Sequence, residues 1–355
     1  MEKNICMGLM MIVSVFLWGT NIVQADAEFP QTYEIEDENV IFHTEIEVPL
    51  YFDSNQLRQS TADCMEIDGE GAFTYFAKGR ETAESYEDSS TGEFYRKLTD
   101  GSSFSYIPSG YISYSSENMP HYFAAFRYYD NRASYAQETE FDFATREVCM
   151  EDFTKLIHEV GYGEVELNGN FYYLDYKTLQ AEEQHENPAS GEIDTSKNKV
   201  SWTQEDSAYQ FYANQQFQGL PVYHSILAVP DDDENGCLIS GVYSTRGFEN
   251  VNVVDIFKFH ETEEGIELLP FEQCAKRVSE KYKRILTESV FTVNRATLYQ
   301  YIERDKKTKK NQKVIPIWYF DILEEGPDTK NPDEKILRRR TMLVNAVTGE
   351  EIVTE

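Results

Sequence analysis

Hydrophobic and polar residues alternate with a period of two in segment 40–52, whose sequence is VIFHTEIEVPLYF. One face carries Phe42, Ile46 and Leu50, and the opposite face carries His43 and Glu45. This alternation is typical of a strand with one buried face. From there to about residue 131 the chain is rich in Tyr, Phe, Ser and Gly, which predicts short strands joined by polar turns.

The period changes to that of an amphipathic helix in two places. Within 142–160 one apolar stripe recurs at i, i+4, i+7 and i+11, formed by Cys149, Phe153, Leu156 and Val160. Asp142 is a candidate N-cap of this helix, and Gly161 suits the position after its C-terminus. A second helix is predicted to begin at Pro270, with an apolar stripe formed by Cys274, Val278, Tyr282 and Ile285.

Strands are predicted after each helix. Segment 163–179 predicts two strands that turn at Asn168-Gly169, and segment 180–199 predicts an exposed polar loop. Segment 215–243 predicts an entry strand, a corner at Gly219-Leu220-Pro221, and a hairpin with strands at 222–229 and 237–243. Later strands are predicted at 290–303, 314–323 and 341–347.

The order helix, strand, strand therefore occurs twice, and it predicts an α+β fold. We expect two units, each a helix laid across an antiparallel sheet, preceded by a small β-rich domain. The predicted segments are a signal peptide at 1–27, the β-rich aromatic domain at 28–140, and the two α+β units at 141–269 and 270–355.

The N-terminus resembles a secretory signal peptide. Lys3 supplies a positive charge, residues 5–18 form an uncharged apolar run, and Ala25 and Ala27 are small residues suited to cleavage. The run is shorter than the roughly 20 residues of a membrane span, although an uncleaved anchor is the alternative. We expect a mature chain without a membrane span, secreted or at the cell surface.

Charge is unevenly distributed over the 355 residues, whose formal net charge is −31. The chain after residue 270 has 17 Lys and Arg against 14 Asp and Glu, and the chain before it has 15 against 49. An acidic surface repels nucleic acid, so nucleic-acid binding is excluded as the expected function. The basic segment 304–313 is interpreted as a solvated loop or as a docking site for an acidic partner.

Four cysteines follow the signal peptide, namely Cys64, Cys149, Cys237 and Cys274. An oxidising compartment permits a disulfide among them. Cys149 and Cys274, however, lie on the apolar stripes of the predicted helices, where buried free thiols are expected. The absence of a C-x-x-C pair argues against zinc or thioredoxin-like chemistry at these cysteines.

No motif predicts a catalytic, metal or cofactor site. Asp231–Gly236 begins like a calcium loop, but Val242 occupies the position of its bidentate Glu, so a hairpin turn is favoured. The six histidines show no metal-ligand spacing and no H-E-x-x-H motif; these are His43, His121, His158, His185, His224 and His260. His224 is expected on the surface of a strand. An aromatic run is interpreted as core or as a glycan-stacking platform, formed by Tyr106, Tyr111, Tyr114, Tyr122, Phe123, Phe126, Tyr128 and Tyr129.

Four short segments carry a family resemblance over residues 142–355. The segments 209–211 (YQF) and 218–223 (QGLPVY) resemble the propeptide motif of the fungalysin and thermolysin family. The segments 316–320 (PIWYF) and 345–350 (NAVTGE) resemble the end of a PepSY-type domain, as in the YycH and YycI regulatory proteins of Gram-positive bacteria. The resemblance implies a non-catalytic fold that binds a peptidase or a sensor kinase.

Three functions follow as hypotheses. The first is a non-catalytic extracytoplasmic binding and regulatory protein with a protein partner in the cell envelope. The second is a glycan- or cell-wall-binding surface protein that uses the aromatic run. The third is a hydrolase whose site is assembled from dispersed carboxylates.

Overall fold

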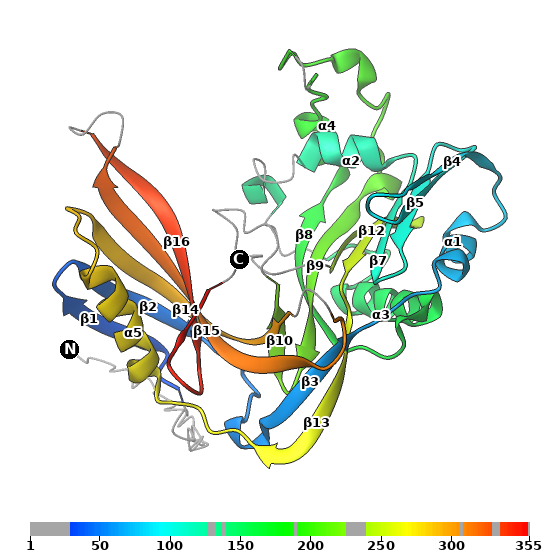
Figure 1. The fold of residues 1–355 in the computed structure, drawn as a ribbon. Coiled ribbons are helices and arrows are strands. Elements are labelled where there is room, and N and C mark those ends of the chain that lie inside the picture. The colour runs from blue at the N-terminus through cyan, green and yellow to red at the C-terminus, as the bar shows by residue number, and fades with distance from the viewer. Residues whose placement is uncertain are drawn as a thin grey trace, which may run out of the picture.

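The computed structural model describes residues 29–126, 132–135, 140–187, 190–224, 239–304, 308–328 and 334–353. These residues form a mixed α+β protein dominated by one large, mostly antiparallel sheet, with five α-helices in the described part. Figure 1 shows two groups of strands that diverge from a shared base, like the arms of a V. We call them the N-terminal lobe, on the right of Figure 1, and the C-terminal lobe, on the left.

The N-terminal lobe is an antiparallel sheet with helices on both faces. Its strands in spatial order are β4 (Thr82–Asp88), β5 (Glu93–Leu98), β6 (Ser103–Ile107), β7 (Tyr111–Ser115), β12 (Gly247–Val254), β11 (Ile239–Ser244), β9 (Ala208–Phe217) and β8 (Leu167–Leu174). Ile239 packs with α1 (Gly69–Ala77) and α3 (Arg146–Ile157), and Val242 packs with α2 (Met119–Phe126) and α4 (Tyr176–Glu182). Because strand residues an odd number apart face opposite sides, the two helix pairs cover opposite faces.

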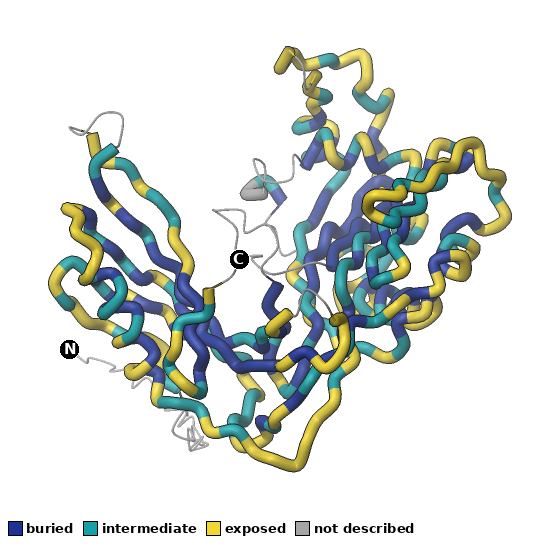
Figure 2. The backbone as a smooth tube through the Cα atoms, in the orientation of Figure 1, coloured by how far each residue is buried: buried dark blue, intermediate teal, exposed yellow. Residues whose placement is uncertain are grey.

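The C-terminal lobe carries one helix. Its strands in spatial order are β1 (Thr32–Asp37), β2 (Val40–Glu47), β14 (Val290–Glu303), β15 (Gln312–Pro327), β16 (Lys335–Asn345) and β17 (Glu351–Ile352). Helix α5 (Phe271–Lys283) buries Phe271, Cys274 and Val278 against one face of this sheet, beside Trp318 and Phe320. Figure 2 shows that the buried backbone follows the sheets, whereas exposed backbone lies along the outer edge of each lobe.

The base of the molecule joins the lobes through shared strands. Strand β14 pairs with β2 along 291–297 and with β10 (Leu220–Tyr223) at 300–301, both in parallel. Strand β15 pairs with β16 along 317–327 and with β3 (Arg58–Cys64) at 312–314, and β3 also pairs with β13 (Phe257–Gly265). Strand pairing therefore crosses both predicted segment boundaries, at 140 and at 269.

The helical stripes read from the sequence are confirmed in α3 and α5. Cys149, Phe153 and Leu156 are buried in the core of the N-terminal lobe, and Cys274, Val278 and Tyr282 in that of the C-terminal lobe. Two details differ. Thr145, rather than Asp142, caps α3 by accepting a hydrogen bond from the Val148 N–H, and Ile285 lies beyond α5 and is exposed.

Several strand predictions were wrong. Asn168-Gly169 lies inside the single strand β8, and the following residues form α4, whose N-cap Asp175 accepts hydrogen bonds from two helix N–H groups.

The corner at Gly219 is confirmed as a two-residue turn between β9 and β10, with positive φ at Gln218 (52°) and Gly219 (75°).

The predicted hairpin of 222–229 with 237–243 is not formed among the described residues. Strand β10 pairs with β9 and β14, and β11 pairs with β9 and β12. The predicted signal peptide at 1–27, the acidic turn at 231–236, Cys237, Tyr128 and Tyr129 lie outside the described residues. No helix in the described ranges has both the length and the apolar character needed to span a membrane.

Candidate functional site

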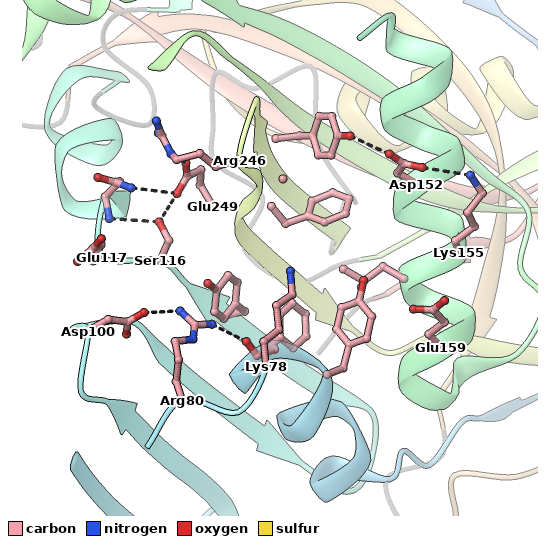
Figure 3. Close-up of a pocket in the computed structure, with 18 residues that line it drawn as sticks. Lys78, Arg80, Asp100, Ser116, Glu117, Asp152, Lys155, Glu159, Arg246 and Glu249 are labelled. Carbon is pink, nitrogen blue, oxygen red and sulfur yellow. Dashed lines mark hydrogen bonds and ion pairs between the residues drawn. The ribbon is translucent and has the colours of Figure 1, made fainter. Parts of the chain in front are cut away.

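The candidate site is a cavity of about 610 Å³ in the N-terminal lobe, which we call the groove. It lies between α1, α3, the end of β7 and the turn that joins β11 to β12 (Figure 3). These elements are far apart in the sequence and meet because β7, β12 and β11 are neighbours in the sheet. The groove is thus a product of the tertiary fold.

Aromatic rings form much of the groove wall. Phe76 of α1 stacks on Tyr114 of β7 with ring centroids 4.6 Å apart and planes at 18°. Tyr75 meets Phe76 edge to face at 5.3 Å, and Tyr243 contacts Phe248 at 4.9 Å. Such rings offer rigid contact area at a small cost in conformational entropy.

Two carboxylates in the groove are already paired. Asp152 accepts a hydrogen bond from the Tyr243 hydroxyl at 2.7 Å and one from Lys155 Nζ at 3.1 Å, and these bonds lower the pKa of Asp152 (Figure 3). Asp100 forms an ion pair with Arg80 and accepts a hydrogen bond from the Ser102 N–H at 3.0 Å. Burial raises the pKa of Asp100, but the bonds from Ser102 and Arg80 outweigh it and lower the pKa. Both carboxylates stay ionised at neutral pH.

A buried ionic network continues from the end of the groove. Arg246 donates from Nε to Glu249 at 2.7 Å and from Nη1 to Asp206 at 2.9 Å, and Lys199 Nζ lies 2.5 Å from Asp206. The side chains of Glu249 and Asp206 are only 3% and 4% exposed. Glu249 also accepts a hydrogen bond from Ser116 at the groove. This network fixes the β11–β12 turn against the segment that precedes β9.

A third buried carboxylate, Glu183, lies between two histidines. His121 Nδ1 is 2.7 Å and His185 Nε2 is 2.9 Å from Glu183 Oε1. Trp202 Nε1 donates to Oε2 at 2.8 Å, and the Lys199 N–H is 3.0 Å from both oxygens. Burial raises the pKa of Glu183, but the hydrogen bonds from Trp202, His185 and His121 lower it overall.

The structure thus brings His121 and His185 together around one carboxylate, an arrangement that the spacing of the histidines in the sequence did not predict. Helix α2 supplies the first and the loop after α4 the second, and α2 contacts α4 in the fold. Sequence reasoning missed the group because the two histidines are far apart in the chain. The sequence offered only the spacing of Glu183 and His185, two residues apart.

The aromatic run falls mostly in the core. Tyr106, Tyr114, Tyr122 and Phe126 are buried, whereas Phe123 is 41% exposed. This placement favours the core interpretation over the glycan-stacking platform.

The structure contradicts the prediction for His224 and agrees with one of the two interpretations of the basic segment 304–313. His224 is buried, contrary to the expectation of a surface position, and burial lowers its pKa to about 3. Arg304 in the basic segment forms an ion pair with Asp255 at 2.6 Å. Lys309 and Lys310 are exposed, as a solvated loop predicts.

Cys64, Cys149 and Cys274 are free and buried, which confirms the prediction of free thiols on the two helices. Burial raises the pKa of Cys274 to about 11 and that of Cys64 to about 12. These thiols are therefore protonated at neutral pH and poorly suited to act as nucleophiles.

Comparison with solved structures identifies the fold in another protein. The crystal structure of an uncharacterized protein from Eubacterium rectale ATCC 33656 has a TM-score of 0.61 and 13% sequence identity. The match covers 92% of this chain and 94% of that chain, and at this identity it concerns the fold alone. Neither a protein family nor a curated protein matches this chain.

Proposed function

We propose that the protein is a non-catalytic, extracytoplasmic binding and regulatory protein whose groove holds a segment of a protein partner in the cell envelope. The observation that carries this proposal is that two carboxylates of the groove are already bound to other side chains of the protein. Asp152 and Asp100 are committed to partners that lower their pKa values. General acid–base catalysis requires a group poised near the operating pH, so these carboxylates suit binding better than hydrolysis.

The composition of the groove supports a protein segment as its ligand. Its wall is aromatic, and its rim presents exposed charges of both signs on Lys78, Glu117, Lys155 and Glu159. Aromatic contact area surrounded by a charged rim is the usual anatomy of a protein interface. Charges of both signs also favour a mixed peptide over a uniformly anionic or cationic ligand.

The finer fold assignment belongs to the same proposal. Helices α3 and α5 each lie on antiparallel strands, β8 and β9 in one lobe and β14 and β15 in the other. We infer that these are two PepSY-like units, as the propeptide-like and YycI-like segments imply. A signal peptide at 1–27 would place them outside the cytoplasm.

Affinity capture with charge-reversed bait tests the proposal. Residues 28–355 would be used as bait on envelope extract, as the natural sequence, as K78E/K155E, and as the control K258E/K276E. Lys258 and Lys276 are exposed and lie away from the groove. We expect K78E/K155E to recover about tenfold less of a specific partner, which corresponds to about 1.4 kcal/mol, and the control to recover it normally.

The result that would overturn the proposal is equal recovery by all three baits, or no specific partner. Circular dichroism would first establish that the variants are folded. A panel of peptide and glycan substrates, tested with the same natural chain, would detect the hydrolase alternative directly.

A further inference from the structure

We propose that His121, Glu183 and His185 form a binding site for a zinc-class divalent metal ion, separate from the groove. The ligand atoms of all three side chains lie within 4.8 Å of one another. Two imidazoles and one carboxylate are the ligand set that Zn²⁺ binds in sites with three protein ligands. Mg²⁺ and Ca²⁺ prefer oxygen ligands throughout, so the two nitrogens select a transition metal.

The geometry converges on one atom. Both ring nitrogens point at Glu183 Oε1, at 2.7 Å and 2.9 Å, and the rings meet edge to face with centroids 5.4 Å apart. Zinc bonds to nitrogen and oxygen measure about 2.0–2.2 Å, so an ion between these atoms requires only small side-chain movements. The nitrogens that now donate to the carboxylate would bind the metal as lone-pair donors after losing a proton.

The carboxylate is held in place by other groups, as metal ligands commonly are. Trp202 Nε1 donates to Glu183 Oε2, which leaves Oε1 directed at the histidines. The Asn198 side chain donates to the Glu183 carbonyl at 3.1 Å, and the Gln184 N–H donates to the Ala124 carbonyl at 3.0 Å. The second bond ties the loop after α4 to α2, the helix that carries His121. The three ligands are thus arranged before any ion binds.

The site is also accessible from solvent. Glu183 is 2% exposed at its side chain, but His185 is 14% and His121 27% exposed. An ion could therefore enter past the histidines and keep a water molecule as its fourth ligand, as in zinc sites with three protein ligands. The competing interpretation is a hydrogen-bonded His–Glu–His group that binds only protons.

Zinc titration of the untagged chain distinguishes the two interpretations. Residues 28–355 would be stripped with a chelator and titrated with Zn²⁺ in competition with a chromophoric chelator, and with Co²⁺ as a spectroscopic probe. We expect one equivalent of Zn²⁺ per chain and a visible Co²⁺ spectrum typical of nitrogen and oxygen ligands. H121A and H185A should each weaken zinc binding by at least about 10- to 100-fold.

The matched control is H260A, because His260 pairs with the single carboxylate of Asp63 at 3.1 Å. It should leave zinc affinity unchanged. W202F retains the three ligands but removes the Trp202 hydrogen bond, and it should weaken binding by about tenfold. Near-UV circular dichroism would verify folding, and H121A keeps the test available if H185A does not fold, because His121 is the more exposed ligand.

Binding of less than one zinc equivalent to the natural chain would overturn the proposal. Unchanged affinity in folded H121A would do the same, since the ion would then be bound elsewhere. The hydrogen-bonded His–Glu–His group would be the correct interpretation in either case.

Discussion

The buried ionic network beside the groove gives the sharpest stability prediction, for the substitution R246A. Arg246 bonds to Glu249 at 2.7 Å and to Asp206 at 2.9 Å, and both carboxylates are almost fully buried. Removing one partner of a buried ion pair costs about 3–5 kcal/mol, because it leaves a buried charge uncompensated. Arg246 is 37% exposed and Asp206 keeps Lys199, so we expect a smaller loss of about 2–4 kcal/mol.

Urea unfolding followed by circular dichroism would measure this loss at pH 7. The matched control is R146A, which removes an exposed ion pair with Glu140 at 3.3 Å and should leave the unfolding midpoint almost unchanged. A loss below about 1 kcal/mol for R246A would refute the argument, because it would mean that water already compensates the two carboxylates.

The same variant makes a pH-dependent prediction. Burial raises the pKa of Asp206, but hydrogen bonds from Lys199, Thr203 and Arg246 lower it overall. Stabilisation by ionised Asp206 is therefore fully present above its unfolded pKa of about 3.9, and it is lost as the pH falls through the lower folded pKa. R246A removes part of that stabilisation. The difference in free energy of unfolding between R246A and the natural chain should therefore be constant above about pH 4 and become smaller below it. A difference that widened at low pH would contradict this assignment.

Three further predictions concern the core. F153A should lower the free energy of unfolding in urea by about 3–5 kcal/mol because Phe153 is fully buried. F123A should lower it far less because Phe123 is partly exposed, and equal losses for the two variants would contradict this packing. G241A should cost about 1–3 kcal/mol, since a Cβ there would lie 2.6 Å from the ring of Phe211, and an unchanged midpoint would contradict this close approach. Cys149 should resist alkylation in the folded chain and react in urea, as peptide mapping by mass spectrometry would show, because it is buried and burial raises its pKa.

The pattern of hydrophobic and polar residues predicted those helices and strands in which buried residues recur at a single regular spacing. The stripes of α3 and α5 and the alternation in β2 were read correctly because each buries a single face. The predicted strand was too long, however, because β2 ends at Glu47 and Leu50, which was expected on the buried face, is exposed. Segment 167–182 was misread because Asn168-Gly169 resembles a hairpin turn, yet both residues lie in a ladder with β9. Asp175, which caps α4, was the signal that could have revealed the helix.

The candidate site could not be predicted from the sequence. The groove joins α1, α3 and the β11–β12 turn, and no spacing rule brings these segments together. The same holds for His121 and His185, which meet only because α2 packs beside α4. His224 was misjudged for a related reason, since its strand neighbours do not show that Phe257 stacks on it at 5.9 Å.

Site-specific photo-crosslinking tests the central claim, that the groove holds a protein partner, most directly. A photoreactive residue would replace Lys78 at the groove rim in one chain and Lys276 on α5 in another, both being exposed positions. After irradiation in living cells, we predict one specific crosslinked protein from position 78 and none from position 276. The absence of a crosslink at position 78, or the same crosslinked protein from both positions, would contradict the account.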